Sequence, residues 1–246
     1  MKSLLQAEAI KHKGTLALSF IFLGPALIVL LMGIQTVMWG AGFSEDMSPA
    51  RFFIQNNLTL WSFLMLPFFI TLITALSAYL EHKNKLWNVL LVGAYSRTQL
   101  FLAKIIFAVA LVWVSYLVWV VFIHVGALLL SLFMDNFRQW TFSDSLYVLS
   151  KISLMAVVSL PMILIHFWVA NRFANILVSF SFGVVVTILN FMVVSSAVNW
   201  LFPWSLPLLA AQPNGIANPF QVTLFLIISV ATVLTLCVRD LRSKEY

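Results

Sequence analysis

The run from Ile105 to Phe133 contains no Asp, Glu, Lys or Arg, and it is the feature that most constrains this chain. An apolar run of more than about 20 residues can cross the hydrocarbon core of a bilayer as a helix. Similar runs recur along the chain, of whose 246 residues 62% are hydrophobic and only 9% are charged. A soluble domain does not have this composition. The sequence therefore predicts an all-α, polytopic membrane protein with a single transmembrane domain over residues 1–246.

Six transmembrane helices are expected, because six apolar stretches alternate with short polar connections. They cover residues 16–39, 58–80, 98–133, 152–170, 176–198 and 219–238. Residues 2–13 mix leucines with charges, which fits a short N-terminal interfacial helix or, alternatively, a frayed tail. Residues 199–218 contain several prolines, which oppose a continuous helix and predict short or re-entrant pieces. The rings of Trp200 and Trp204 are expected at the outer membrane interface.

The distribution of basic residues orients these spans. Of the 14 Lys and Arg residues, all but Arg51, Arg138 and Lys151 lie on the face that also holds both termini. The positive-inside rule makes that face cytoplasmic. The net charge of +6 is thus explained by membrane topology, and no nucleic-acid partner is expected.

The most informative connection runs from Glu81 to Lys104, between the second and third spans. Leu86 to Val92 is apolar apart from Asn88, and Gly93 follows it, which predicts a short helix on the cytoplasmic surface. Ser96 and Gln99 have the spacing of a capping box, which would begin the third span. The apolar face of the short helix would fit a groove on a soluble partner, with charges at the rim; its apolar residues are Leu86, Trp87, Leu90 and Leu91, and its charged ones Glu81, Lys83 and Arg97. The alternative is an ordinary membrane-edge loop without a partner.

The order Glu81, Trp87, Leu90-Leu91, Ser96-Arg97 and Lys104 resembles the first cytoplasmic loop of type 2 ABC exporter permeases. The likeness is strongest to the small six-span subunits of lantibiotic and bacitracin self-protection, although Asn88 stands where Lys is usual and Ala94 where Pro is usual. In that family the loop is the cytoplasmic coupling helix that contacts a separate ABC ATPase subunit, which binds ATP and Mg. The resemblance also implies a second permease subunit, identical or homologous, in a bacterial cytoplasmic membrane. It implies that an amphipathic substrate, a peptide antibiotic or drug, is exported by alternating access.

Two absences agree with this expectation. The chain has no GxxxxGK[ST] segment to hold nucleotide phosphates, so ATP hydrolysis is expected on a partner chain and this subunit is not expected to be an enzyme. No Asp or Glu lies well inside a predicted span, which argues against a carrier driven by protons or sodium. Cys237 is the single cysteine, and we expect no cofactor or metal bound by this chain.

Three polar residues inside the spans are candidates for a transport pathway: His124, His166 and Asn190. The two histidines lie toward opposite faces in this topology, so a shared metal or catalytic pair is not expected, whereas His12 and His82 are expected at the surface. Two other functions stay open. The chain could be an intramembrane enzyme that uses His124 or His166, or a membrane anchor or sensor that recruits an ATPase without transporting anything.

Overall fold

The computed structural model describes residues 1–39, 48–83, 95–134, 137, 140–173 and 175–243. In this part of the chain the regular secondary structure is entirely helical, as the sequence predicts. Five stretches are long and apolar enough to cross a membrane, and a sixth span arises when one bent helix pair is taken together. The described residues therefore confirm an all-α membrane protein with five to six candidate spans.

The first three spans are α2 (Leu16–Trp39), a continuous run over Pro49–Leu80, and α6 (Arg97–Phe133). The second of these consists of α3 (Pro49–Leu60), one π-helical turn, η1 (Trp61–Met65), and α4 (Leu66–Lys83). The capping box predicted for α6 is present. The Ser96 hydroxyl accepts a hydrogen bond from the Gln99 backbone N–H, and the Gln99 side-chain oxygen accepts one from the Ser96 backbone N–H.

The fourth span is the bent pair α7 (Phe142–Val158) and α8 (Leu160–Arg172), whose axes meet at 42°. Pro161 lies just after the bend, where its missing N–H and its ring interrupt the helical hydrogen bonds. The fifth span is α9 (Ile176–Val193), capped by Asn175, and the sixth is α11 (Pro219–Ser243). Between them lie the short helices η3 (Asn199–Leu201) and α10 (Leu206–Ala211), which confirms that this segment is not a continuous helix.

Two spans begin earlier than the sequence analysis places them. The second helix starts at Pro49 instead of Leu58, because Ser48 accepts from the Arg51 backbone and proline suits the first helical position. The fourth starts at Phe142 instead of Ile152, behind a capping box of Thr141 and Asp144. Hydropathy misses both extensions because their side chains include polar groups that face other helices instead of lipid. Two spans end at other residues than predicted: α9 stops at Val193 instead of Val198, and α11 continues through Ser243 instead of ending at Val238.

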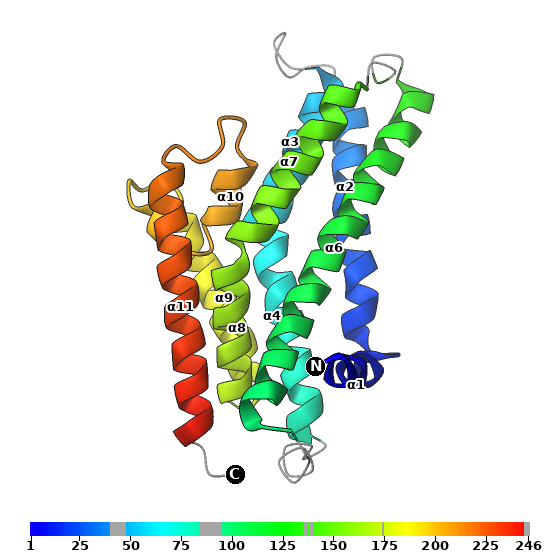
Figure 1. The fold of residues 1–246 in the computed structure, drawn as a ribbon. Helices are drawn as coiled ribbons and strands as arrows, with labels where there is room; N and C mark the ends of the chain where they lie inside the picture. Colours follow the sequence, from blue (N-terminus) through cyan, green and yellow to red (C-terminus); the bar gives the residue numbers. More distant parts are fainter. Residues whose placement is uncertain (40–47, 84–94, 135–136, 138–139, 174, 244–246) are drawn as a thin grey trace.

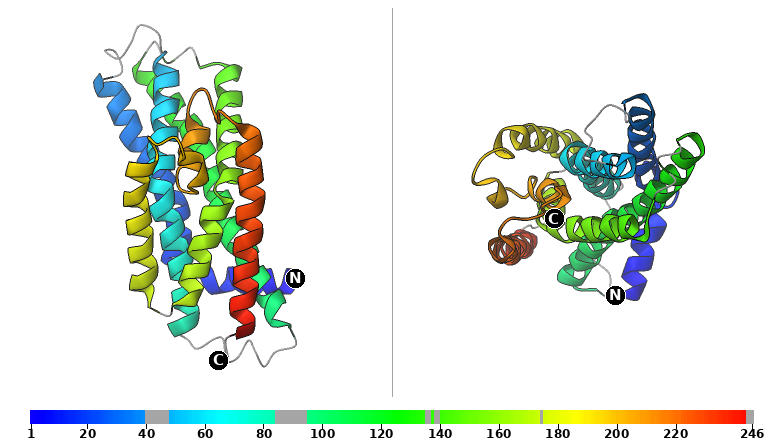
Figure 2. Two further views of the ribbon diagram at one scale, coloured as in Figure 1. Left: turned by 90° about the vertical axis from the view of Figure 1, so that its left-hand side faces the viewer. Right: turned by 90° about the horizontal axis from the view of Figure 1, so that it is seen from above.

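The spans form one elongated bundle (Figure 1). We call its lower end in Figure 1, near both termini, the α1 end, and the opposite end the α10 end. Helix α1 (Lys2–His12) lies crosswise to the spans, against α6 (Figure 1). Helix α4 lies inside, in contact with α8 and α9, whereas α11 packs at the edge against α8 (Figure 2). The core includes the stacked rings of Trp61 and Trp119, 4.9 Å between centroids.

Candidate functional site

The predicted coupling segment lies mostly outside the described residues. Leu86, Trp87, Leu90 and Leu91 all belong to the part that the structure leaves out, and their proposed contact with an ATPase stays a prediction. The flanking backbone is described: Glu81 and Lys83 belong to the last turn of α4, and Arg97 is the first residue of α6. Both helices reach the α1 end of the bundle, so the segment connects there (Figure 1).

Beside this connection, α1 is held against the spans by a buried charge cluster. Glu8 and Lys104 are only 7% and 5% exposed, and the Lys104 Nζ donates to Glu8 Oε1 at 3.3 Å. Lys11 donates to the same oxygen at 2.7 Å. Burial raises the pKa of Glu8, but Lys104 and Lys11 together hold that pKa below its ordinary value. The cluster thus fixes α1 to α6 through an ionised carboxylate.

His12 extends this cluster to α4, and its predicted place at the surface is wrong, since its side chain is only 2% exposed. Its Nδ1 lies 2.9 Å from the Glu8 carbonyl oxygen, which can only accept, so Nδ1 carries a proton. Its Nε2 lies 2.8 Å from Ser77 Oγ on α4. Burial lowers the pKa of His12, although Glu8 opposes the shift. The Ser77 hydroxyl donates to the Ile73 carbonyl at 2.7 Å, so Ser77 links the His12 ring to the backbone of α4. The spacing of Leu4, Glu8 and His12, one face of a helix, is the sequence signal for this contact.

His166 forms a second polar network, inside the bundle. Thr71 on α4 donates its hydroxyl to the Pro67 carbonyl at 2.7 Å, so its oxygen accepts from His166 Nδ1 at 3.3 Å. Trp204 Nε1 donates to His166 Nε2 at 3.1 Å. The neutral Nδ1–H ring satisfies both bonds, whereas a protonated ring would place two N–H groups face to face. Both nitrogens are therefore engaged, and neither is open to a substrate in this conformation.

Asn190 belongs to the same network and anchors the segment that precedes α10. Its amide nitrogen donates to the Trp204 carbonyl at 3.2 Å, and its oxygen accepts from the Ser205 hydroxyl at 2.6 Å. Trp204 is 4% exposed, so its predicted place at the membrane interface is wrong. The tryptophan enters the bundle because His166 and Asn190 satisfy its polar groups there.

Replacing Trp204 with phenylalanine keeps an aromatic ring but removes the donor to His166 Nε2. A buried acceptor left without its donor costs about 1–3 kcal/mol, so we expect a lower midpoint of thermal unfolding in detergent. The matched control is Trp200→Phe, the same change on a partly exposed ring. Equal midpoints for the two variants would contradict the assigned bond.

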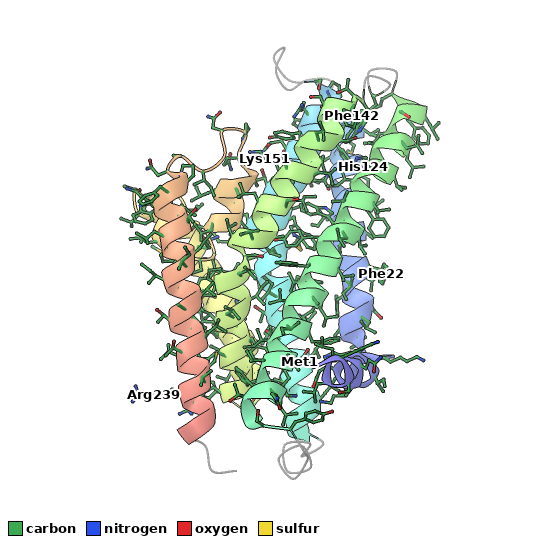
Figure 3. All side chains as sticks on the ribbon, in the orientation of Figure 1. Met1, Phe22, His124, Phe142, Lys151 and Arg239 are labelled. Atoms are coloured by element: carbon green, nitrogen blue, oxygen red, sulfur yellow. The ribbon has the colours of Figure 1, made fainter. Side chains whose placement is uncertain are left out.

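His124 lies apart from this network, toward the α10 end (Figure 3). Its Nδ1 is 2.8 Å from the Val120 carbonyl, and its Nε2 is 3.1 Å from Ser145 Oγ, which also accepts from Trp140 Nε1. The two histidines thus have separate partners. Among the residues that the structure describes, no three His, Cys, Asp or Glu side chains come together to hold a metal ion.

Two apolar grooves open on the surface of the spans. One, of about 310 Å³, lies between α2, the η1–α4 region and α9. Its wall is formed in part by the π-helical turn η1 and by several aromatic rings. The other, of about 440 Å³, lies between α2 and the α10 end of α6. Sequence reasoning missed both, since each combines residues from different spans. The residues that line the first are Phe20, Leu23, Gly24, Leu27, Trp61, Met65, Phe68, Phe69, Leu72 and Phe180.

Comparison with known proteins agrees with the helical membrane fold. A family model described as "ABC-2 family transporter protein" matches residues 4–190. Comparison with curated proteins and with solved structures found no match. ABC-2 permeases work with ABC ATPase subunits and have no ATPase activity of their own. Because the match covers more than half of the chain, from α1 through most of α9, this protein belongs to the ABC-2 family of transporter membrane proteins and is a permease component.

Proposed function

We propose that the chain is the membrane-spanning subunit of an ATP-driven exporter and that an ABC ATPase binds residues 81–97. The observation that supports this most directly is that α4 ends and α6 begins at the α1 end of the bundle. Most of the Lys and Arg residues of the sequence belong to the segments that meet at this end. The positive-inside rule makes this end cytoplasmic, where an ATPase and its ATP are available. Both termini then lie in the cytoplasm, and the α10 end faces outward.

The proposed substrate is amphipathic, in the class of peptide antibiotics such as bacitracin or a lipid-soluble drug. The groove between α2, η1, α4 and α9 supports this class, because its apolar and aromatic walls suit an apolar ligand. The π-helical turn at Trp61–Met65 adds support, since such turns are frequent at functional sites. A second permease subunit, identical or homologous, would complete the pathway, and closure of the ATPases would shift the spans between two states.

The experiment that tests the proposed function is copurification from the native host after detergent solubilisation. The wild type is expected to retain a protein with a Walker motif, and Leu90→Asp is expected to lose it, because a charge on the apolar face cannot enter a hydrophobic groove. Asn88→Asp adds the same charge at the one polar position of the predicted helix, and we expect it to retain the partner. Both variants must first be shown to insert as well as the wild type.

The outcomes separate the alternatives. Absence of any ATPase from the wild-type sample would contradict the central proposal, whereas equal loss with both variants would place the partner contact elsewhere in the loop. Turnover of the copurified ATPase in vesicles that rises with added bacitracin would support the peptide class. An ATPase that binds but responds to no amphipathic substrate would support the anchor or sensor instead.

A further inference from the structure

Helix α10 lies inside the bundle, although it is only a short helix between two spans. Leu206, Ala210 and Ala211 are fully buried, and the helix packs against α7, α3 and η1. Figure 2 places it among the spans instead of above them. Its start is fastened through Trp204 and Ser205 to α8 and α9, as described above.

The end of α10 is fastened by two polar side chains from other spans. The last carbonyl groups of a helix have no partner within it. Here Gln55 Nε2 on α3 donates to the Ala211 carbonyl at 3.2 Å. Lys151 Nζ on α7 donates to the Gln212 carbonyl and, at 3.3 Å, to that of Pro213. A cation at this position is also favoured by the helix dipole.

Lys151 is unusual for a lysine in a membrane span. It is 8% exposed and lies between α7 and the chain that follows α10 (Figure 3). A charged side chain within a span is costly unless it is paired, so residues of this kind tend to have a specific task. Its hydrogen-bond partners here are two backbone carbonyls of one short segment, and its Nζ also lies 5.4 Å from the centre of the Tyr147 ring.

The residues around Lys151 join α3 to α7. Tyr147 donates its hydroxyl to Gln55 Oε1 at 3.2 Å, and Arg51 lies over the Tyr147 ring at 4.3 Å. Arg51 Nε also pairs with Asp144 Oδ1 at 2.8 Å. Helix α10 is therefore bound at its end to two spans that are themselves joined.

We propose that Lys151 and Gln55 are positioning residues that form a latch: they hold α10 between α3 and α7 and close the α10 end of the bundle. This inference rests on the proposed function: α10 is the element that must be released when substrate leaves on the outer side. Gln55 on α3 bonds the Ala211 carbonyl, and Lys151 on α7 bonds the Gln212 and Pro213 carbonyls. Loss of these hydrogen bonds would free the end of α10 from both spans.

The test measures access to α10 directly. In a Cys237→Ala background, which removes the single native cysteine, Ala210→Cys places a thiol on the fully buried face of α10. A membrane-impermeant maleimide is added to intact cells that contain the full chain. With Lys151 and Gln55 present, labelling is expected to be slow. Lys151→Met keeps the length of the side chain but removes its donors, and we expect labelling to be at least roughly tenfold faster, given the strength of a charged hydrogen bond.

Two further variants make the result decisive. Lys151→Arg keeps a cation and donors and is expected to label nearly as slowly as the parent. Gln55→Met removes the other bond without touching the lysine, and about fivefold faster labelling is expected. A cysteine at Asn218, which is exposed in the structure, reports on folding and insertion and should label equally in every background.

Unchanged labelling of Ala210→Cys in both Lys151→Met and Gln55→Met, with the Asn218 reporter normal, would overturn the latch. A rise that occurs in inside-out vesicles instead of intact cells would support the latch but contradict the orientation in the proposed function. Failure of the latch therefore leaves the copurification result standing, and the two hypotheses fail separately.

Discussion

Replacement of Gly183 by alanine is expected to cost about 3 kcal/mol of stability, near the upper end for overpacking a well-packed interior. A Cβ atom at this position of α9 would clash with Thr71 Oγ1 and would lie 2.5 Å from Thr71 Cγ2. Neither atom can move freely, because Thr71 is buried and its oxygen is bonded to both Pro67 and His166. The missing side chain therefore permits the close approach of α4 and α9.

The measurement is the midpoint of thermal unfolding in detergent, followed as the fraction that elutes as monodisperse protein. Gly33→Ala is the matched control, since a Cβ there meets nothing within 4 Å and alanine favours a helix more than glycine does. Thr71→Ala combined with Gly183→Ala removes the two nearest atoms and leaves only the Cβ contact at 2.8 Å. We expect partial recovery in this double variant. No difference between Gly183→Ala and Gly33→Ala would contradict the assigned contact.

Replacement of Glu8 by glutamine is expected to have the second large effect, about 3–5 kcal/mol, because removal of one partner from a buried ion pair leaves the other charge poorly compensated. Two lysines, Lys104 and Lys11, donate to the Glu8 carboxylate. The variant should show a lower unfolding midpoint and faster tryptic cleavage next to α1. Lys13→Gln removes an exposed charge just after the same helix, and we expect a change within about 0.5 kcal/mol.

The double variant Glu8→Gln with Lys104→Met removes both charges of the more buried pair and leaves only Lys11, whose side chain is more exposed. We expect it to be more stable than Glu8→Gln alone. Acid provides a further check. Because the folded-state pKa of Glu8 lies below its ordinary value of 4.5, the carboxylate contributes stability above that pH and loses it as the pH falls through the folded-state value. The difference between wild type and Glu8→Gln should therefore be full at neutral pH and shrink below pH 4.5. A difference that does not change with pH would exclude the ion pair as its cause.

Local patterns predicted the features that depend on short stretches of chain. Apolar runs identified the five candidate spans of the described residues and the bent pair that can form a sixth, and the Ser96–Gln99 spacing predicted the capping box at the start of α6. The interruption between the fifth and sixth spans was also predicted, because prolines act on their immediate neighbours. The early starts at Pro49 and Phe142 were missed since hydropathy alone discounts helical turns that carry polar residues.

The sequence by itself determined that the chain is helical, that it crosses a membrane repeatedly and that its basic residues divide unequally between two faces. Only the tertiary structure decided which polar groups meet: Glu8 with Lys104, Thr71 with His166, and Gln55 and Lys151 with the end of α10. The physical reason is that partition into lipid is a property of each segment, which composition records. A buried polar pair depends instead on which faces of distant helices come together, and hydropathy contains no information about that choice.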